Sequence, residues 1–202
     1  MNTGLVHGPL SGAICHVAVD MQIYFAENSE WASPATLAIL PMVERLAAHA
    51  PARTIFTRFM PPHAEAHATG QWQTYYRRWA SVLGQNNDPA IYDLLPPLRR
   101  FVPPAHVVDK PTYSAFEAPG FLETLARLGC ETMILSGVET DVCVLATALT
   151  AVDRGIRVIL ATDAMASGSA EGHDRILDTL VPRYDRQIET ASCITILERW
   201  TP

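Results

Sequence analysis

Three residues of different chemical character each follow a short apolar run that is rich in β-branched side chains. They are the carboxylate of Asp20, the ammonium of Lys110 and the thiol of Cys143. A thiol can attack a carbonyl carbon while a neighbouring carboxylate takes its proton and later returns it. A nearby ammonium and a helix N-terminus lower the pKa of a thiol, so we expect a lowered pKa for Cys143. These residue types permit nucleophilic acyl transfer in which no step needs a metal.

Each of the three also has an ordinary structural interpretation. Asp20 could cap a helix or a turn, Lys110 could be a surface charge before Pro111, and Cys143 could be a small packing residue. Lys110 is, however, the only lysine among the 15 lysine and arginine residues. An ammonium is compact and has three rotatable donors, so it suits places where a rigid guanidinium does not fit. We therefore favour a shared site over three unrelated roles.

Alternating strand and helix patterns would bring these residues together. Helices are expected after the N-cap Ser33, before Gly129, before Gly155, and as a last helix that Ser169 opens. Such alternation predicts a parallel α/β sheet, which binds ligands beyond the carboxyl ends of its strands. The expected strands are Cys15–Val19, Thr54–Thr57, His106–Val108, Thr132–Leu135, Arg157–Leu160 and Cys193–Leu197, and the expected helices cover about 34–47, 121–128 and 141–154, with Ile176, Leu177 and Leu180 on the buried side of the last helix.

The whole chain, residues 1–202, is expected to form one domain with a long insertion at about 58–105. The insertion contains several prolines and the aromatic, basic stretch Trp72–Trp79. Insertions of this length are usually binding loops, lids or interfaces. For Trp72–Trp79 we favour core or subunit interface over a pocket wall, and we expect a homo-oligomer, either a dimer or a tetramer.

Composition narrows the function classes. The net charge is −6, which argues against nucleic acid as a partner, and the chain lacks an apolar stretch long enough to span a membrane. We see no signal peptide in residues 1–13 and no metal-binding spacing among the four cysteines, so we expect a cytoplasmic protein with free thiols. Cys15, Cys130 and Cys193 are interpreted as small hydrophobic residues of the core.

Three segments together resemble the isochorismatase-like cysteine hydrolases. They are Val17–Gln22, Asp109–Phe116 and Gly137–Val144, within a likeness that runs from Cys15 to Leu197. That family includes nicotinamidases, carbamoylsarcosine and ureidoacrylate amidohydrolases, and maleamate-type amidases. The resemblance implies a three-layer α/β/α fold with a six-stranded parallel sheet in the order 3-2-1-4-5-6.

The resemblance also implies roles for individual residues. Asp20 would be the general acid and base, Lys110 the ammonium that orients it, and Cys143 the nucleophile. The family places a cis peptide where this chain has Val138–Glu139. It implies an oxyanion site made by the backbone N–H groups of Glu139 and Cys143.

Differences from relatives affect the expected chemistry. Nicotinamidases carry an Asp-x-His metal element after the second strand, which residues 57–62 here lack. His63 and His67 have the spacing of a helical metal site, but Pro61 and Pro62 favour a loop, so no metal and no cofactor are expected. A cysteine at position 143 favours cleavage of a C–N bond over the vinyl-ether cleavage of isochorismatase itself.

The substrate is expected to be a small molecule of unspecified identity. Arg58 could pair with a substrate carboxylate, or it could hold the loop after the second strand by bonding backbone carbonyls. The side chain of Glu139 could bind a substrate cation or could form a salt bridge. Candidate substrate-binding residues are Gln22, Phe25, Arg58, Trp79, Tyr113 and Phe116.

Two other classes of function remain as alternatives. A redox protein would oxidise Cys143 and would need a resolving cysteine, although none lies near it in the sequence. A binding or assembly protein on a hydrolase scaffold would not need all three polar residues. The leading hypothesis is a metal-independent amidohydrolase that acts through a thioester.

Overall fold

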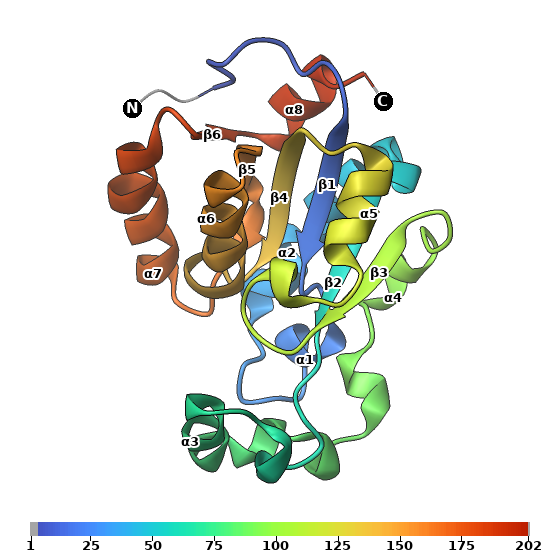
Figure 1. Ribbon diagram of the computed structural model, residues 1–202, viewed down its shortest axis with the longest axis vertical. Coiled ribbons are helices and arrows are strands. Elements are labelled where there is room, and N and C mark those ends of the chain that lie inside the picture. The colour runs from blue at the N-terminus through green and yellow to red at the C-terminus, as the bar shows by residue number, and fades with distance from the viewer. Residues whose placement is uncertain (1–3, 202) are drawn as a thin grey trace.

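The computed structural model describes residues 4–201, and these form a six-stranded sheet with helices on both faces (Figure 1). All neighbouring strands are parallel, in the order β3-β2-β1-β4-β5-β6, which confirms the predicted order. The strands are β1 (Ile14–Val19), β2 (Thr54–Phe59), β3 (His106–Lys110), β4 (Thr132–Val138), β5 (Arg157–Ala166) and β6 (Ile188–Ala191).

Two hydrophobic cores lie on opposite faces of this sheet. Helices α2 and α8 contribute to one core, whereas α5 and α6 contribute to the other. The helices are α1 (Ile23–Ala26), α2 (Pro34–His49), α3 (Gln71–Arg78), α4 (Pro96–Arg99), α5 (Phe121–Leu128), α6 (Leu145–Asp153), α7 (Ala170–Arg175) and α8 (Cys193–Arg199). Within residues 4–201, no helix is both long enough and apolar enough to cross a bilayer.

Strand β1 shows why continuous apolar runs form the centre of the sheet. All six of its residues are buried, and successive side chains point to opposite faces. Val17 and Val19 join the core under α5 and α6, whereas Ile14 and Ala18 join the core under α2. Every residue of the strand except His16 is therefore apolar, and the strand ends where the polar Asp20 begins.

Local sequence signals explain where two helices begin and end. The Ser33 side chain accepts a hydrogen bond from the Ala35 N–H, and Pro34 occupies the first position of α2. Helix α5 ends at Gly129, whose φ of +63° is the left-handed conformation that glycine adopts without strain. Both ends agree with the sequence prediction.

The C-terminal prediction was wrong in one element. The sixth strand is β6, Ile188–Ala191, and the apolar run 193–197 lies instead in α8. The Ser192 side chain accepts from the Thr195 N–H, so it caps a helix there. Cys193 and Ile196 are buried and Ile194 is 52% exposed, which is helical spacing rather than strand alternation.

The helix predicted after Ser169 exists but is short and is not the last one. Ser169 caps α7, and a π-helical turn over Ile176–Leu180 continues it. Ile176, Leu177 and Leu180 are half-buried, and Ile176 and Leu177 pack against the core on the α5–α6 side.

The long connection between β2 and β3 covers residues 60–105. It contains α3, α4 and several single-turn helices. Figure 1 shows α3 beyond the end of the sheet at which β1 terminates. The insertion therefore lies at the carboxyl ends of the strands, where parallel sheets bind ligands.

Candidate active site

Asp20 is the first residue after β1, and a hydroxyl from β2 fixes its carboxylate. Its backbone has φ of +52°, a left-handed value that is uncommon for residues other than glycine. The Asp20 N–H donates to Thr57 Oγ1 at 3.1 Å, and Thr57 Oγ1 donates to Asp20 Oδ1 at 2.7 Å. Both side chains are fully buried. Oδ2 is thereby left to face the other candidate residues.

Lys110 lies at the end of β3 and connects the acid to the thiol. Its Nζ is 2.7 Å from Asp20 Oδ2, and it donates to Thr112 O at 3.0 Å and to Cys143 Sγ at 3.4 Å. Burial by itself lowers the pKa of Lys110, but the charges and hydrogen bonds of Asp20 and Cys143 outweigh it and raise the pKa. The fully buried ammonium therefore stays charged.

Cys143 lies in a π-helical turn, Thr140–Val144, between β4 and α6. Such turns occur often at functional sites. The Thr147 hydroxyl, one turn later, donates to the Cys143 carbonyl at 2.8 Å and accepts from the Ala115 N–H at 3.0 Å. Thr147 thus connects the cysteine turn to the segment after β3.

The pKa of Cys143 is raised rather than lowered, contrary to the expectation from its neighbours. Burial is the largest cause, and the negative charge of Asp20 also raises it. Lys110 lowers the pKa but only partly offsets these effects. The resting group is therefore a thiol whose proton a base must remove, and Asp20 is the neighbouring carboxylate.

The backbone before the cysteine turn packs tightly against the end of β1. Gly137 has φ of +102°, and a Cβ at this position would overlap the Val19 carbonyl. The Val138–Glu139 peptide that follows is cis. Only glycine allows β4 to approach β1 this closely, immediately before Asp20.

A cavity of about 250 Å³ opens onto Cys143. Most of its wall is aromatic, and the remaining lining residues are Glu139, Val142 and Cys143. The aromatic lining residues are Phe25, Trp31, Phe59, Tyr75, Trp79 and Tyr113. Asp20, Lys110 and Cys143 therefore form a buried polar group at one end of an apolar cavity, an arrangement typical of small-molecule sites.

This arrangement can be compared with known proteins. The family model for the isochorismatase domain matches residues 15–192 of the chain. The chain belongs to the isochorismatase family. The chain is also similar to the solved structure of a cysteine hydrolase from Pseudomonas syringae pv. phaseolicola 1448A. The two structures superpose with a TM-score of 0.83 at 24% sequence identity, and the match covers 98% of each chain.

Two further relatives carry names of amide-cleaving enzymes. Nicotinamidase 3 of Arabidopsis thaliana is 39% identical over 77 residues, which make up 38% of this chain and 39% of that protein. N-carbamoylsarcosine amidase from Thermoplasma acidophilum has a TM-score of 0.69 at 18% identity, covering 90% of this chain and 97% of that one. The chain thus spans about two fifths of the length of the nicotinamidase, and the structural likeness shows the fold.

For this isochorismatase-family chain, part of the predicted substrate-binding set lines the cavity. Phe25, Trp79 and Tyr113 do so. Trp31, Phe59, Tyr75 and Val142 also line the cavity and are not among the predicted substrate-binding residues. Two of them had a sequence signal: Tyr75 belongs to the aromatic stretch Trp72–Trp79, and Val142 belongs to the segment Gly137–Val144. Helix α3 and the residue after it therefore contribute Tyr75 and Trp79 to the cavity wall.

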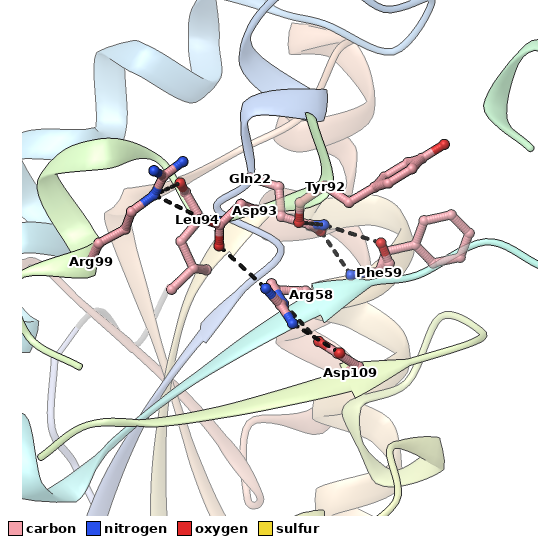
Figure 2. A network of polar contacts seen from close by, with 8 residues as sticks. All are labelled: Gln22, Arg58, Phe59, Tyr92, Asp93, Leu94, Arg99 and Asp109. Carbon is pink, nitrogen blue, oxygen red and sulfur yellow. Dashed lines mark hydrogen bonds and ion pairs between the residues drawn. The ribbon is translucent and has the colours of Figure 1, made fainter. Parts of the chain in front are cut away.

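Gln22 and Arg58 do not line the cavity, and Figure 2 shows what they bind instead. The Gln22 side chain donates to Phe59 O at 3.1 Å and to Tyr92 O at 2.6 Å, and it accepts from the Phe59 N–H at 2.7 Å. Gln22 therefore joins the segment after β1 to β2 and to the insertion, because its amide satisfies buried backbone groups there.

Arg58 makes a two-pronged ion pair with Asp109 of β3, at 2.7 and 2.9 Å (Figure 2). Its third nitrogen donates to Asp93 Oδ1 at 3.2 Å, and Arg99 also pairs with Asp93 at 3.0 Å. Of the two roles considered for Arg58, holding the loop fits these contacts, although its partners are carboxylates rather than carbonyls. Its guanidinium is already occupied by these carboxylates.

Phe116 also lies outside the cavity lining. It is buried and packs edge-to-face on Phe121, with ring centroids 5.0 Å apart. Its neighbours belong to the core on the α5–α6 side of the sheet. Its place in the matched segment after Lys110 reflects packing of that segment against α5.

The two histidines of the insertion lie near each other on a loop and a single-turn helix. The rings of His63 and His67 are 6.4 Å apart, nearly parallel. Within the described part of the chain, no group of three or more histidine, cysteine or acidic side chains is arranged to hold a metal ion. Cys15, Cys130 and Cys193 are free; Cys15 and Cys193 are buried and Cys130 is half-buried.

Proposed function

We propose that this chain is a cysteine hydrolase that cleaves a C–N bond of a small amide, ureido or carbamoyl compound through a thioester on Cys143. The observation that carries the proposal is the contact chain from Asp20 through Lys110 to Cys143 at the wall of the cavity. The amide-cleaving relatives support the choice of bond.

In the first half-reaction, Asp20 acts as a general base. It takes the proton of the Cys143 thiol as Sγ attacks the substrate carbonyl carbon. The tetrahedral intermediate then collapses: the C–N bond breaks, and Asp20 returns the proton to the departing nitrogen. The products of this step are ammonia or an amine and an acyl group joined to Sγ.

In the second half-reaction, water replaces the amine. Asp20 takes a proton from a water molecule as the water oxygen attacks the thioester carbon. The C–S bond breaks, Asp20 returns the proton to Sγ, and the acid leaves. Lys110 keeps its charge throughout, because its role is to orient Asp20 and to donate a hydrogen bond to sulfur.

The backbone N–H groups of Glu139 and Cys143 are the proposed oxyanion site. Both residues line the cavity; Glu139 immediately precedes the π-helical turn, and Cys143 is the fourth residue of the turn, just before α6. The first N–H groups of a helix lack partners within the helix and carry its partial positive charge. Donors of this kind stabilise the negative oxygen of a tetrahedral intermediate.

The proposal is tested by measuring ammonia release from a panel of small amides, ureides and carbamoyl compounds. We expect turnover by the unchanged protein and an acyl adduct on Cys143 in the mass spectrum with a slow substrate. Cys143→Ala should lower the rate to background. Lys110→Arg should also abolish hydrolysis although it keeps the positive charge, because Lys110 is fully buried and a guanidinium is larger than an ammonium.

Cys130→Ala is the matched control, because Cys130 is a free thiol that does not line the cavity. It should keep the activity of the unchanged protein. Hydrolysis that persists in Cys143→Ala would contradict the proposed nucleophile.

A further inference from the structure

Glu139 is the one acidic residue among the described residues that line the cavity. Glu139 lines it beside Cys143, and none of the described lining residues is a lysine, arginine or histidine. Two cations discussed for this site have other partners: Lys110 pairs with Asp20, and Arg58 pairs with Asp93 and Asp109. A substrate carboxylate would therefore find no counter-charge in the lining and would meet Glu139.

The Glu139 side chain is held in place by only one of its oxygens. Oε1 accepts a hydrogen bond from the Gly168 N–H at 2.9 Å. For Oε2, no hydrogen-bond partner exists among residues 4–201. Burial raises the pKa of Glu139, and the charges of Asp141 and Asp20 raise it further, whereas the Gly168 hydrogen bond lowers it. A cation bound in the cavity would relieve this unfavourable negative charge.

The rest of the wall suits a cation as well. The Trp31 ring centroid lies 5.8 Å from that of Trp79, 6.0 Å from that of Phe59 and 6.1 Å from that of Tyr75, so four rings from three segments of the chain lie close together. Aromatic faces attract ammonium groups, and several rings together form the sites that hold quaternary ammonium ligands.

We infer that Glu139 and these aromatic rings select a substrate whose acyl part carries an ammonium group, and that they discriminate against substrates bearing a carboxylate. This inference rests on the proposed function, because it concerns the same cavity and assigns the class of compound that Cys143 attacks. Glu139 is then the residue that determines charge specificity.

The test is a binding measurement that does not depend on turnover. Calorimetry of the Cys143→Ala protein compares the trimethylammonium derivative of acetamide with its tert-butyl isostere, which has the same shape and no charge. We expect the cationic amide to bind at least about tenfold more tightly, as an ammonium in an aromatic site with a carboxylate should. Succinamate, which bears a carboxylate, should bind most weakly.

Glu139→Gln in the same background should bring the two isosteres to similar affinities, because the amide keeps the shape and removes the charge. Glu171→Gln is the matched control: it removes an equal charge from an exposed position on α7, three residues beyond Gly168, and should leave the preference unchanged. A protonated Glu139 would make Glu139→Gln silent, and that result would overturn the inference.

The outcomes separate this inference from the proposed function. Hydrolysis of the amide panel by the protein with Cys143, without preference for the cation in binding, leaves the function standing and overturns the inference. Preference for the cation that Glu139→Gln abolishes, without hydrolysis, supports the inference and contradicts the function. Failure of both isosteres to bind overturns the inference.

Discussion

The buried contact between Asp20 and Thr57 shows how a single hydroxyl orients the carboxylate that we propose as the base. Thr57 donates to Oδ1 and accepts from the Asp20 backbone, so the carboxylate has one orientation and presents Oδ2 to Lys110. Thr57 lies in β2, and nothing in the sequence indicates this role for it. Its importance arises because β2 lies beside β1 in the sheet.

Thr57→Val should therefore lower activity while keeping the shape of the side chain. A hydrogen bond to a charged group contributes about 1.5–3 kcal/mol, so we expect kcat/KM to fall roughly 10- to 100-fold. Steady-state kinetics on any turned-over amide measures this effect. Thr57→Ser keeps the hydroxyl and should retain most of the activity; equal losses in both variants would show that the methyl group, not the hydrogen bond, matters.

At the scale of elements, β1 and β4 are placed so that the acid and the cysteine turn meet. The two strands pair along their whole length, from Ile14 opposite Thr132 to Val19 opposite Gly137. At the last pair the absence of a Cβ lets the backbones come together. The spacing between Asp20 and the turn that carries Cys143 depends on this contact.

Gly137→Ala should consequently destabilise the fold strongly. The new methyl group would overlap the Val19 carbonyl between two central strands, and we expect a loss of more than about 3 kcal/mol in the free energy of unfolding. Gly155→Ala is the control, because Gly155 also has positive φ, at +74°, but has open space around it. It should cost only about 1–2 kcal/mol, as backbone strain alone does. Denaturant unfolding of both proteins checks the comparison.

At the scale of the whole molecule, the insertion closes the site and the sheet supports it. Gln22 and Arg58 connect the ends of β1 and β2 to Tyr92 and Asp93 of the insertion. These contacts hold the segment that follows α3 over the ends of the strands, so that aromatic rings far apart in the sequence surround Cys143. Function therefore depends on the stability of the entire sheet.

That stability should decline in mild acid because of His16. This side chain is fully buried in the central strand, between Thr54 of β2 and Ser136 of β4, and burial lowers its pKa to about 3. In the unfolded chain its pKa is about 6.5, so protonation favours unfolding as the pH falls from 6.5 towards 3. At pH 5 this effect alone should cost about 2 kcal/mol relative to pH 7.5.

Unfolding free energies of the unchanged protein and of His16→Asn, measured at both pH values, isolate the contribution of this residue. The variant is expected to be less stable at pH 7.5 but to lose about 2 kcal/mol less between the two pH values. Parallel losses in the two proteins would show that His16 is not the group responsible.

The sequence by itself determined the sheet and the meeting of Asp20, Lys110 and Cys143. Strand runs are local patterns, and parallel topology brings the residues that follow them to the same edge. The sequence pattern misassigned β6, because the β-branched residues after Ser192 favour a strand, whereas the Ser192 cap and the burial of Cys193 and Ile196 make this segment a helix. Only the tertiary structure decided the direction of the Cys143 pKa shift, since burial depends on the packed environment. The tertiary structure also decided the partners of Arg58 and the aromatic wall of the cavity. These contacts join residues that are far apart in the sequence, and such contacts produce no periodic pattern along the chain.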